Sequence, residues 1–224
     1  MTTDQSRQAL AANQDVLVGV IDYDAGNAPS VVSALTHLGH KSRLIAQASD
    51  LEGVDRIVLP GVGSAQATMD SLAELGLIAP LAERVLGRKL PFLGICVGLQ
   101  ILFEHSEEGD VACLGWLRGR VRRYHGAGLR VPQIGWNTAL RQREHALLSG
   151  LPVSGHYYFV NSYYVEPAEP SVVLCATDYG VRFASMVAAN NVMAAQFHVE
   201  KSGPLGLRIL DNFARSAVTE LCGG

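Results

Sequence analysis

The sequence lacks paired cysteines, because none of its four cysteines lies in a C-x-x-C pair. Cysteines at that spacing are typical of zinc and redox centres, and dense cysteine patterns are typical of secreted disulfide scaffolds. We therefore expect no metal site and no disulfide framework, and the cysteine usage fits a reducing cytoplasm. The sequence also has no apolar run that reaches the ~20 residues of a membrane-spanning helix.

Charge is sparse and nearly balanced along the chain. Charged residues make up 17% of the 224 residues and the formal net charge is −3, which argues against nucleic acid or an anionic membrane as a partner. Hydrophobic residues make up 48%, which indicates a globular chain with a sizeable core. Residues 1–15 are polar and lack a signal-peptide core, so we expect a disordered extension followed by one domain over residues 16–224.

The first half of the chain alternates between short apolar runs and segments with helical spacing. The runs predict strands at residues 16–21, 56–59 and 92–95, and the spacing predicts helices at 29–38, 65–75, 80–86 and 98–103. This alternation predicts an α/β fold with a mostly parallel central sheet and helices on both faces. Beyond an acid-rich and glycine-rich loop at 104–115, short runs predict added antiparallel strands at 120–124, 157–163, 172–176 and 182–187. Leu210, Phe213, Ala214 and Ala217 predict one face of a closing helix.

Cys96 lies where an apolar run turns into a helix-like segment, within the stretch 90–100. The turn would place its thiol at the carboxyl end of a strand and beside a helix N-terminus, which favours the reactive thiolate. Gly94 and Gly98 remove the Cβ atoms that would collide in so tight a turn. The G-x-C-x-G pattern therefore predicts a nucleophile elbow, with a buried unreactive cysteine as the alternative.

His198 and Glu200 follow a predicted strand at residues 192–198 near the other end of the chain. Residues two apart on an extended chain point to the same side. A cysteine nucleophile needs a base to accept its proton, and the base needs a third group to orient it. Together with Cys96, this pair predicts a catalytic triad in place of a solvated strand end.

A glycine-rich turn at Gly61, Val62 and Gly63 follows the strand predicted at 56–59. Its flexibility would let the Val62 backbone N–H face a developing oxyanion, and the N–H of Val97, next to the nucleophile, is a second candidate donor. The turn is too short for a G-x-G-x-x-G fingerprint, so we expect no dinucleotide and no other cofactor.

Three segments, 60–63, 94–100 and 196–202, resemble the class I, triad-type glutamine amidotransferases. Three more, 22–27, 131–137 and 157–163, are similar to the branch of that family in histidine biosynthesis, the glutaminase subunits of imidazole glycerol phosphate synthase. The resemblance extends from about residue 16 to the end of the chain. It implies that Cys96, His198 and Glu200 hydrolyse glutamine, and that Gly63 and Gln100 help to hold this substrate.

The same resemblance implies a partner for the chain. Members of the branch form a heterodimer with a (β/α)8-barrel cyclase, which receives ammonia through an internal channel and makes imidazole glycerol phosphate and AICAR. Asn27, Tyr158 and Lys201 match family positions at that interface. Tyr157 and Tyr158 are adjacent in a predicted strand and face opposite ways, so one is expected in the core and the other at the interface.

The chain departs from the family pattern at several positions. Val199 replaces a proline between the triad His and Glu, Ala28-Pro29 replaces Leu-Arg, and Gln133 and Asn161 replace histidines. These departures leave open a paralogue that supplies ammonia to a different synthase. A stand-alone cysteine hydrolase and a binding protein with an inactive site are the other two alternatives. The acid two residues after the His argues against the former, and the intact Cys, His and Glu argue against the latter.

Overall fold

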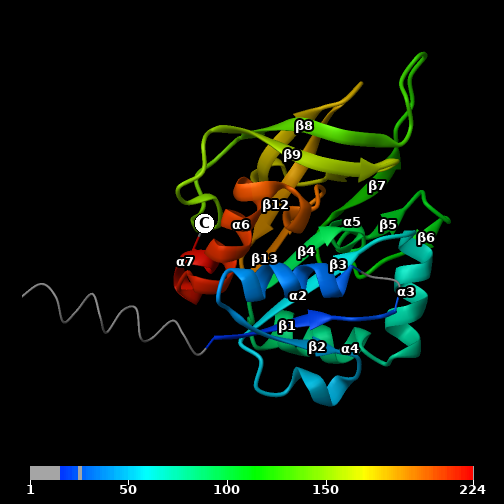
Figure 1. Ribbon diagram of the computed structural model, residues 1–224. Coiled ribbons are helices and arrows are strands. Elements are labelled where there is room, and N and C mark those ends of the chain that lie inside the picture. Colours follow the sequence, from blue (N-terminus) through cyan, green and yellow to red (C-terminus); the bar gives the residue numbers. More distant parts are fainter. Residues whose placement is uncertain (1–15, 25–26, 224) are drawn as a thin grey trace, which may run out of the picture.

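Five parallel strands form the centre of the sheet in the computed structural model, which describes residues 16–24 and 27–223. Their spatial order is β2 (Lys41–Ile45), β1 (Leu17–Ile21), β3 (Arg56–Gly61), β4 (Phe92–Cys96) and β13 (Val192–Ala195) (Figure 1). The expected extension at residues 1–15 lies outside the described residues. The carboxyl ends of β3 and β4 meet, since Gly61 pairs with Cys96 in the parallel ladder.

Helices pack on both faces of this central sheet (Figure 1). They are α2 (Ala28–His37), α3 (Ala65–Glu74), α4 (Ile78–Ala82), α5 (Val97–Gln100), α6 (Gly203–Arg215) and α7 (Val218–Cys222). Short helical turns are η1 (Ala48–Leu51), η2 (Glu83–Gly87), η3 (Ala146–Leu148), η4 (Pro170–Val172) and η5 (Val199–Lys201). Helix α3 begins where the Ser64 hydroxyl accepts the Ala67 N–H at 3.2 Å, a regular N-cap. None of the described helices is both long and apolar enough to cross a membrane.

Antiparallel strands continue the sheet beyond β13. In spatial order they are β12 (Arg182–Ala189), β10 (Tyr163–Pro167) and β7 (Gly119–Arg123), followed by the short β5 (His105–Ser106) and β6 (Val111–Ala112), with β5 parallel to β7. A branch leaves β12 through β11 (Val173–Asp178), β8 (Gln133–Arg141) and β9 (Ser154–Asn161). The predicted α/β architecture is thus confirmed, with parallel strands at the centre and antiparallel strands added at one side.

The structure corrects several element boundaries. The strand predicted at 157–163 is two strands that break at Ser162, and the loop predicted at 104–115 contains β5 and β6. Strand β2 was not predicted, because this edge strand is polar and mostly exposed and so lacks an apolar run. Strand β8 was not predicted either, since its buried positions do not alternate regularly. Helix α6 ends at Arg215, so Ala217 lies beyond it.

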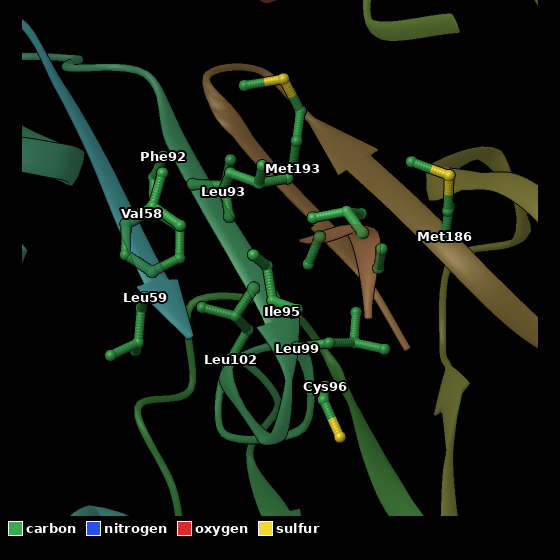
Figure 2. Close-up of a cluster of buried hydrophobic side chains, with 14 of the residues drawn as sticks. Val58, Leu59, Phe92, Leu93, Ile95, Cys96, Leu99, Leu102, Met186 and Met193 are labelled. Carbon is green, nitrogen blue, oxygen red and sulfur yellow. The ribbon is translucent and has the colours of Figure 1, made fainter. Parts of the chain in front are cut away.

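A continuous hydrophobic core holds the elements together. Figure 2 shows part of it around β4, with Leu93, Ile95 and Leu99 among the packed side chains and the Cys96 sulfur pointing away from them at the edge of the cluster. Buried Arg56 ties β3 to the end of α6 by donating to the Phe213 and Ser216 carbonyls, each at 2.6 Å. These bonds satisfy carbonyl groups that a helix terminus leaves unpaired.

Candidate active site

The turn at Cys96 is tight and strained. Cys96 ends β4 with φ at 55° and ψ at −108°, a backbone conformation that costs non-glycine residues energy, and α5 begins at the next residue. A Cβ atom on Gly98 would lie 2.1 Å from the Leu59 carbonyl oxygen, and one on Gly94 would lie 2.4 Å from the Gly98 oxygen. The strand, turn and helix predicted around Cys96 are therefore present, and both flanking glycines are required sterically.

His198 and Glu200 come together by a different route from the one that their spacing suggested. Strand β13 ends at Ala195, and Glu200 lies in the turn η5, so the two residues do not alternate on an extended strand. The helical turn instead folds the carboxylate back, and Glu200 Oε1 lies 2.9 Å from His198 Nδ1. The side chains of His198 and Glu200 are only 4% and 1% exposed, so the pair is shielded from water.

Electrostatics at the pair favour a charged imidazole and a charged carboxylate. Burial alone opposes the charge on His198, but its hydrogen bonds to Cys96 and Glu200 outweigh burial and raise the pKa of His198 to about 9. Burial likewise opposes the charge on Glu200, yet His198 and Asn27 hold the pKa of this carboxyl below its usual range. His198 thus bridges Cys96 on one side and Glu200 on the other.

A cavity of about 230 Å³ opens beside this pair. Its lining includes Cys96, His198, Gln100, Val62 and Gly63, so the structure brings these predicted site residues together. The remaining lining residues are Val97, Glu108, Pro132, Val160, Asn161, Ser162 and Tyr163. The predicted nucleophile, base and substrate residues therefore border one space.

Glu108 is a site residue that the sequence did not single out. It is half-buried, lines the cavity and accepts the Ala65 N–H at 2.9 Å, while burial raises the pKa of its carboxyl. Its segment is a loop rich in acid and glycine, with no spacing that relates Glu108 to Cys96. Only the fold brings this carboxylate to the cavity.

Gln100 is buried and held in a polar network below the nucleophile. Its Nε2 donates to Gln196 Oε1 at 3.1 Å and to the Tyr163 carbonyl at 3.2 Å. The Gln196 Nε2 lies 3.8 Å from Cys96 Sγ. This network fixes the orientation of both amides behind the thiol.

The glycine-rich turn lies against the hydroxyl of Tyr23. Gly63 adopts φ at 99°, and a Cβ atom on Gly61 would lie 3.0 Å from the oxygen of the buried Tyr23 hydroxyl. The Tyr23 hydroxyl lies 3.4 Å from Thr68 Oγ1, which donates its own proton to the Ser64 carbonyl at 3.0 Å. Since Thr68 has no second proton, Tyr23 must donate to it, which leaves the Tyr23 oxygen free to accept from the neighbouring Val62 N–H. The Val97 amide belongs to the first residue of α5.

The three residues expected at a partner interface lie close to the predicted triad. Tyr158 is half-buried beside Trp136, with ring centroids 6.0 Å apart, and its carbonyl accepts the His198 N–H at 3.0 Å. Tyr157 is buried and stacked on Phe197, so the two adjacent tyrosines face opposite ways as predicted. Lys201 is exposed at the end of η5. Asn27 is half-buried, and its side chain contacts Glu200.

The unusual Gln133 and Asn161 face each other across β8 and β9. Both are buried and joined through Tyr124, whose hydroxyl accepts from Asn161 Nδ2 at 3.1 Å and donates to Gln133 Oε1 at 3.3 Å. Two amides and a phenol therefore form one hydrogen-bonded unit here. Val199, the other departure near the site, is fully buried in η5.

Comparisons with known proteins agree with one another. The family model for glutamine amidotransferase class-I matches residues 19–217. Imidazole glycerol phosphate synthase subunit HisH from Dehalococcoides mccartyi is 41% identical, covering 90% of this chain and 98% of the relative. The subunit of that name from Xanthomonas oryzae pv. oryzae is 46% identical, covering 88% and 96%.

Two solved structures share the fold. A crystal structure of a glutamine amidotransferase aligns with a TM-score of 0.68 at 23% identity, covering 92% of this chain and 99% of that one. The structure of PurLQS from Thermotoga maritima aligns with a TM-score of 0.68 at 17% identity, covering 88% and 97%. At these identities the likeness concerns the fold alone.

Proposed function

Because the chain belongs to the class-I glutamine amidotransferase family and, within it, to the HisH subunits of imidazole glycerol phosphate synthase, we propose that Cys96, His198 and Glu200 form its glutaminase triad. The chain is a glutamine amidotransferase that supplies ammonia for histidine biosynthesis. The observation that best supports this triad is the position of His198 between Cys96 and Glu200 at the edge of one cavity.

The reaction proceeds through a thioester. The Cys96 sulfur attacks the side-chain amide carbon of glutamine, and the carbonyl oxygen becomes an oxyanion. His198 gives a proton to the nitrogen as the carbon–nitrogen bond breaks, so ammonia leaves and a γ-glutamyl thioester remains. His198 then takes a proton from water, which attacks the thioester and releases glutamate. Glu200 orients the imidazole and stabilises its charged form.

The oxyanion forms at the turn that bears Val62. The Val97 N–H and the Val62 N–H are the proposed donors, and the latter must first leave the Tyr23 hydroxyl. This requirement gives the resting chain a low rate of hydrolysis until a partner favours the rotated turn.

Glutamine binds along the cavity with its α-carbon end away from the thiol. Gln100 and the backbone at Gly63 contact the substrate, and the half-buried Glu108 carboxylate pairs with the α-ammonium group. A carboxylate in a cavity of this size selects an amino acid over an uncharged amide.

The partner is a (β/α)8-barrel cyclase that docks on the β8–β9 face to form a heterodimer in the cytoplasm. Large apolar side chains on this face are exposed, with Ile134 at 63% and Trp136 at 57%. Exposed aromatic residues of this kind are typical of interface anchors. The Tyr158 carbonyl accepts the His198 N–H, and Lys201 follows Glu200 in η5. Ammonia passes from this region into the barrel, which makes imidazole glycerol phosphate and AICAR.

The test is Cys96→Ala in the assembled complex, with glutamine or ammonium as the nitrogen source. We expect glutamine-dependent synthesis to be lost and ammonium-dependent synthesis to survive, because only the glutaminase step uses the thiol. Retained glutamine-dependent turnover would overturn the nucleophile assignment. Turnover of glutamine by wild type at the same rate with and without the cyclase would instead favour a stand-alone hydrolase.

A further inference from the structure

Asn27 stands at the N-cap of α2 but does not use its side chain to cap the helix. Its backbone carbonyl accepts the N–H groups of Ser30 at 3.2 Å and Val31 at 3.3 Å. Asparagine is favoured at N-caps because its side-chain oxygen accepts an N–H of the first turn. No such side-chain bond forms here among the described residues. Helix capping therefore explains the position of Asn27 but not its side chain.

The side chain instead contacts the buried carboxylate of Glu200. Asn27 Nδ2 donates to Glu200 Oε1 at 2.6 Å, and His198 Nδ1 approaches the same oxygen at 2.9 Å. The other oxygen, Oε2, is buried without a hydrogen-bond partner in the described part of the chain. One oxygen thus carries both side-chain contacts of this carboxylate, and Asn27 supplies one of them.

We propose that Asn27 is a positioning residue of the glutaminase triad, which anchors Glu200 Oε1 so that the carboxylate stays aimed at His198. This inference rests on the proposed function, and it assigns Asn27 a role other than the interface contact that the family resemblance implies. The side chain is absent from the lining of the glutamine cavity, so it acts through Glu200 and not on the substrate.

The geometry explains what the anchor prevents. Glu200 also borders an open groove of about 440 Å³ against α2, whose lining includes Pro29, Ser33 and His37. Without the Asn27 amide, the carboxylate can rotate toward this groove and leave Nδ1 of His198 without a fixed acceptor. A misplaced imidazole slows proton transfer although every triad residue is still present.

Three substitutions separate positioning from capping. Asn27→Ser keeps a good N-cap but is too short to reach Glu200, Asn27→Ala removes both abilities, and Asn27→Asp keeps the shape but replaces the donor with a second carboxylate. In the complex with saturating cyclase, we expect kcat for glutamate release to fall about tenfold or more in all three variants, since a bond to a charged group is lost. KM for glutamine should change little.

The pH profile supplies a readout that a structural role would not move. The titratable groups facing Glu200 are His198, with Cys96 beyond it, and His37 across the groove. The Asn27 amide lowers the pKa of Glu200, so its loss raises that pKa. The acid limb of kcat should therefore move to higher pH, and move furthest in Asn27→Asp.

A double substitution completes the test. With Glu200→Gln as background, Asn27→Ala should add little further loss, because the carboxylate that it anchors is gone. A normal kcat in Asn27→Ser would overturn the proposal and leave Asn27 as a cap. Recovery of kcat at high cyclase concentration would also overturn it, because Asn27 would then act through binding of the cyclase. Failure of the proposed function itself is distinguishable, since Cys96→Ala would then retain glutamine-dependent turnover.

Discussion

The two parts of the sheet differ in how they bury their residues. Strands β3, β4 and β13 in the parallel centre are buried at every position, whereas β8 and β9 in the antiparallel branch combine buried with exposed positions. The centre provides Cys96 and the glycine-rich turn from strands that neighbours hold on both sides. The branch provides a cavity wall and an exposed aromatic surface. The candidate nucleophile therefore lies where the backbone is fixed, and the proposed docking surface lies where one face of the sheet remains open.

The two parts meet at the proposed triad. The His198 N–H donates to the Tyr158 carbonyl at 3.0 Å, and the Tyr158 N–H donates to Ser202 Oγ at 3.0 Å. The Cys96 thiol also lies 3.7 Å from the Val160 carbonyl. Movement of β9 by a docked partner would therefore reach His198 and Cys96 directly.

The largest loss should follow from removing the proposed base, which lies just beyond the end of β13. His198→Asn should lower glutaminase kcat at least about a thousandfold, because no other group moves the proton. Glu200→Gln should lower kcat by a factor at least about tenfold smaller, since Glu200 only orients and stabilises His198. Steady-state glutamate release by the two variants and by the double variant tests this. A double variant much worse than His198→Asn alone would show that Glu200 acts independently.

Glycine substitutions compare the steric tolerance of the two parts. Gly98→Ala should lower the free energy of unfolding by about 3 kcal/mol or more, because its Cβ would meet the Leu59 carbonyl oxygen at 2.1 Å. Gly155→Ala in β9 should cost about 1 kcal/mol, because its Cβ would meet side-chain atoms of Tyr157 and Leu205 at 2.9 and 3.0 Å. Chemical unfolding of both variants measures the difference. Equal losses of unfolding free energy would contradict the idea that the parallel centre is more rigid than the antiparallel branch.

Trp136→Ala should weaken cyclase binding while leaving the fold intact. The side chain is 57% exposed, and loss of an aromatic anchor raises Kd by about thirtyfold, or 2 kcal/mol. Trp116→Ala is the matched control, because this indole is partly buried and packs on Phe92 with ring centroids 5.1 Å apart. It should lower Tm and leave Kd unchanged. Titration calorimetry measures Kd and thermal melts measure Tm for both variants. A raised Kd in Trp116→Ala with an unchanged Kd in Trp136→Ala would contradict the prediction.

Tyr23→Phe should have the smallest effect and should increase activity. It removes the oxygen that can accept the Val62 N–H in the resting turn, so glutamate release by the chain without cyclase should rise about three- to tenfold, the effect of one neutral hydrogen bond. The cyclase-stimulated rate should stay the same. Tyr157→Phe, a buried tyrosine in β9, is the control and should leave both rates unchanged. An unchanged rate without cyclase in Tyr23→Phe would show that the Tyr23 hydroxyl does not restrain the Val62 N–H.

Much of the parallel centre was predictable from local sequence. A buried strand is a short apolar run, and the strand, elbow and helix around Cys96 follow from residues next to one another. The family was likewise recognisable from contiguous motifs, and the same motifs supplied the candidate site residues other than Glu108. The polar edge strand β2 and the split at Ser162 were missed, because neither leaves a regular apolar pattern.

The sequence by itself determined which residue types carry the chemistry, because the elbow glycines, the thiol and the His-x-Glu pair are local features. Only the tertiary structure decided how they meet. It brought Glu108 to the cavity from a loop, placed the Tyr23 hydroxyl beside the glycine-rich turn, and turned the Asn27 side chain from its helix to Glu200, 173 residues away. Such contacts depend on how α2, β3 and η5 pack at the carboxyl ends of the central strands. They join residues far apart in the sequence, so no spacing along the chain could predict them.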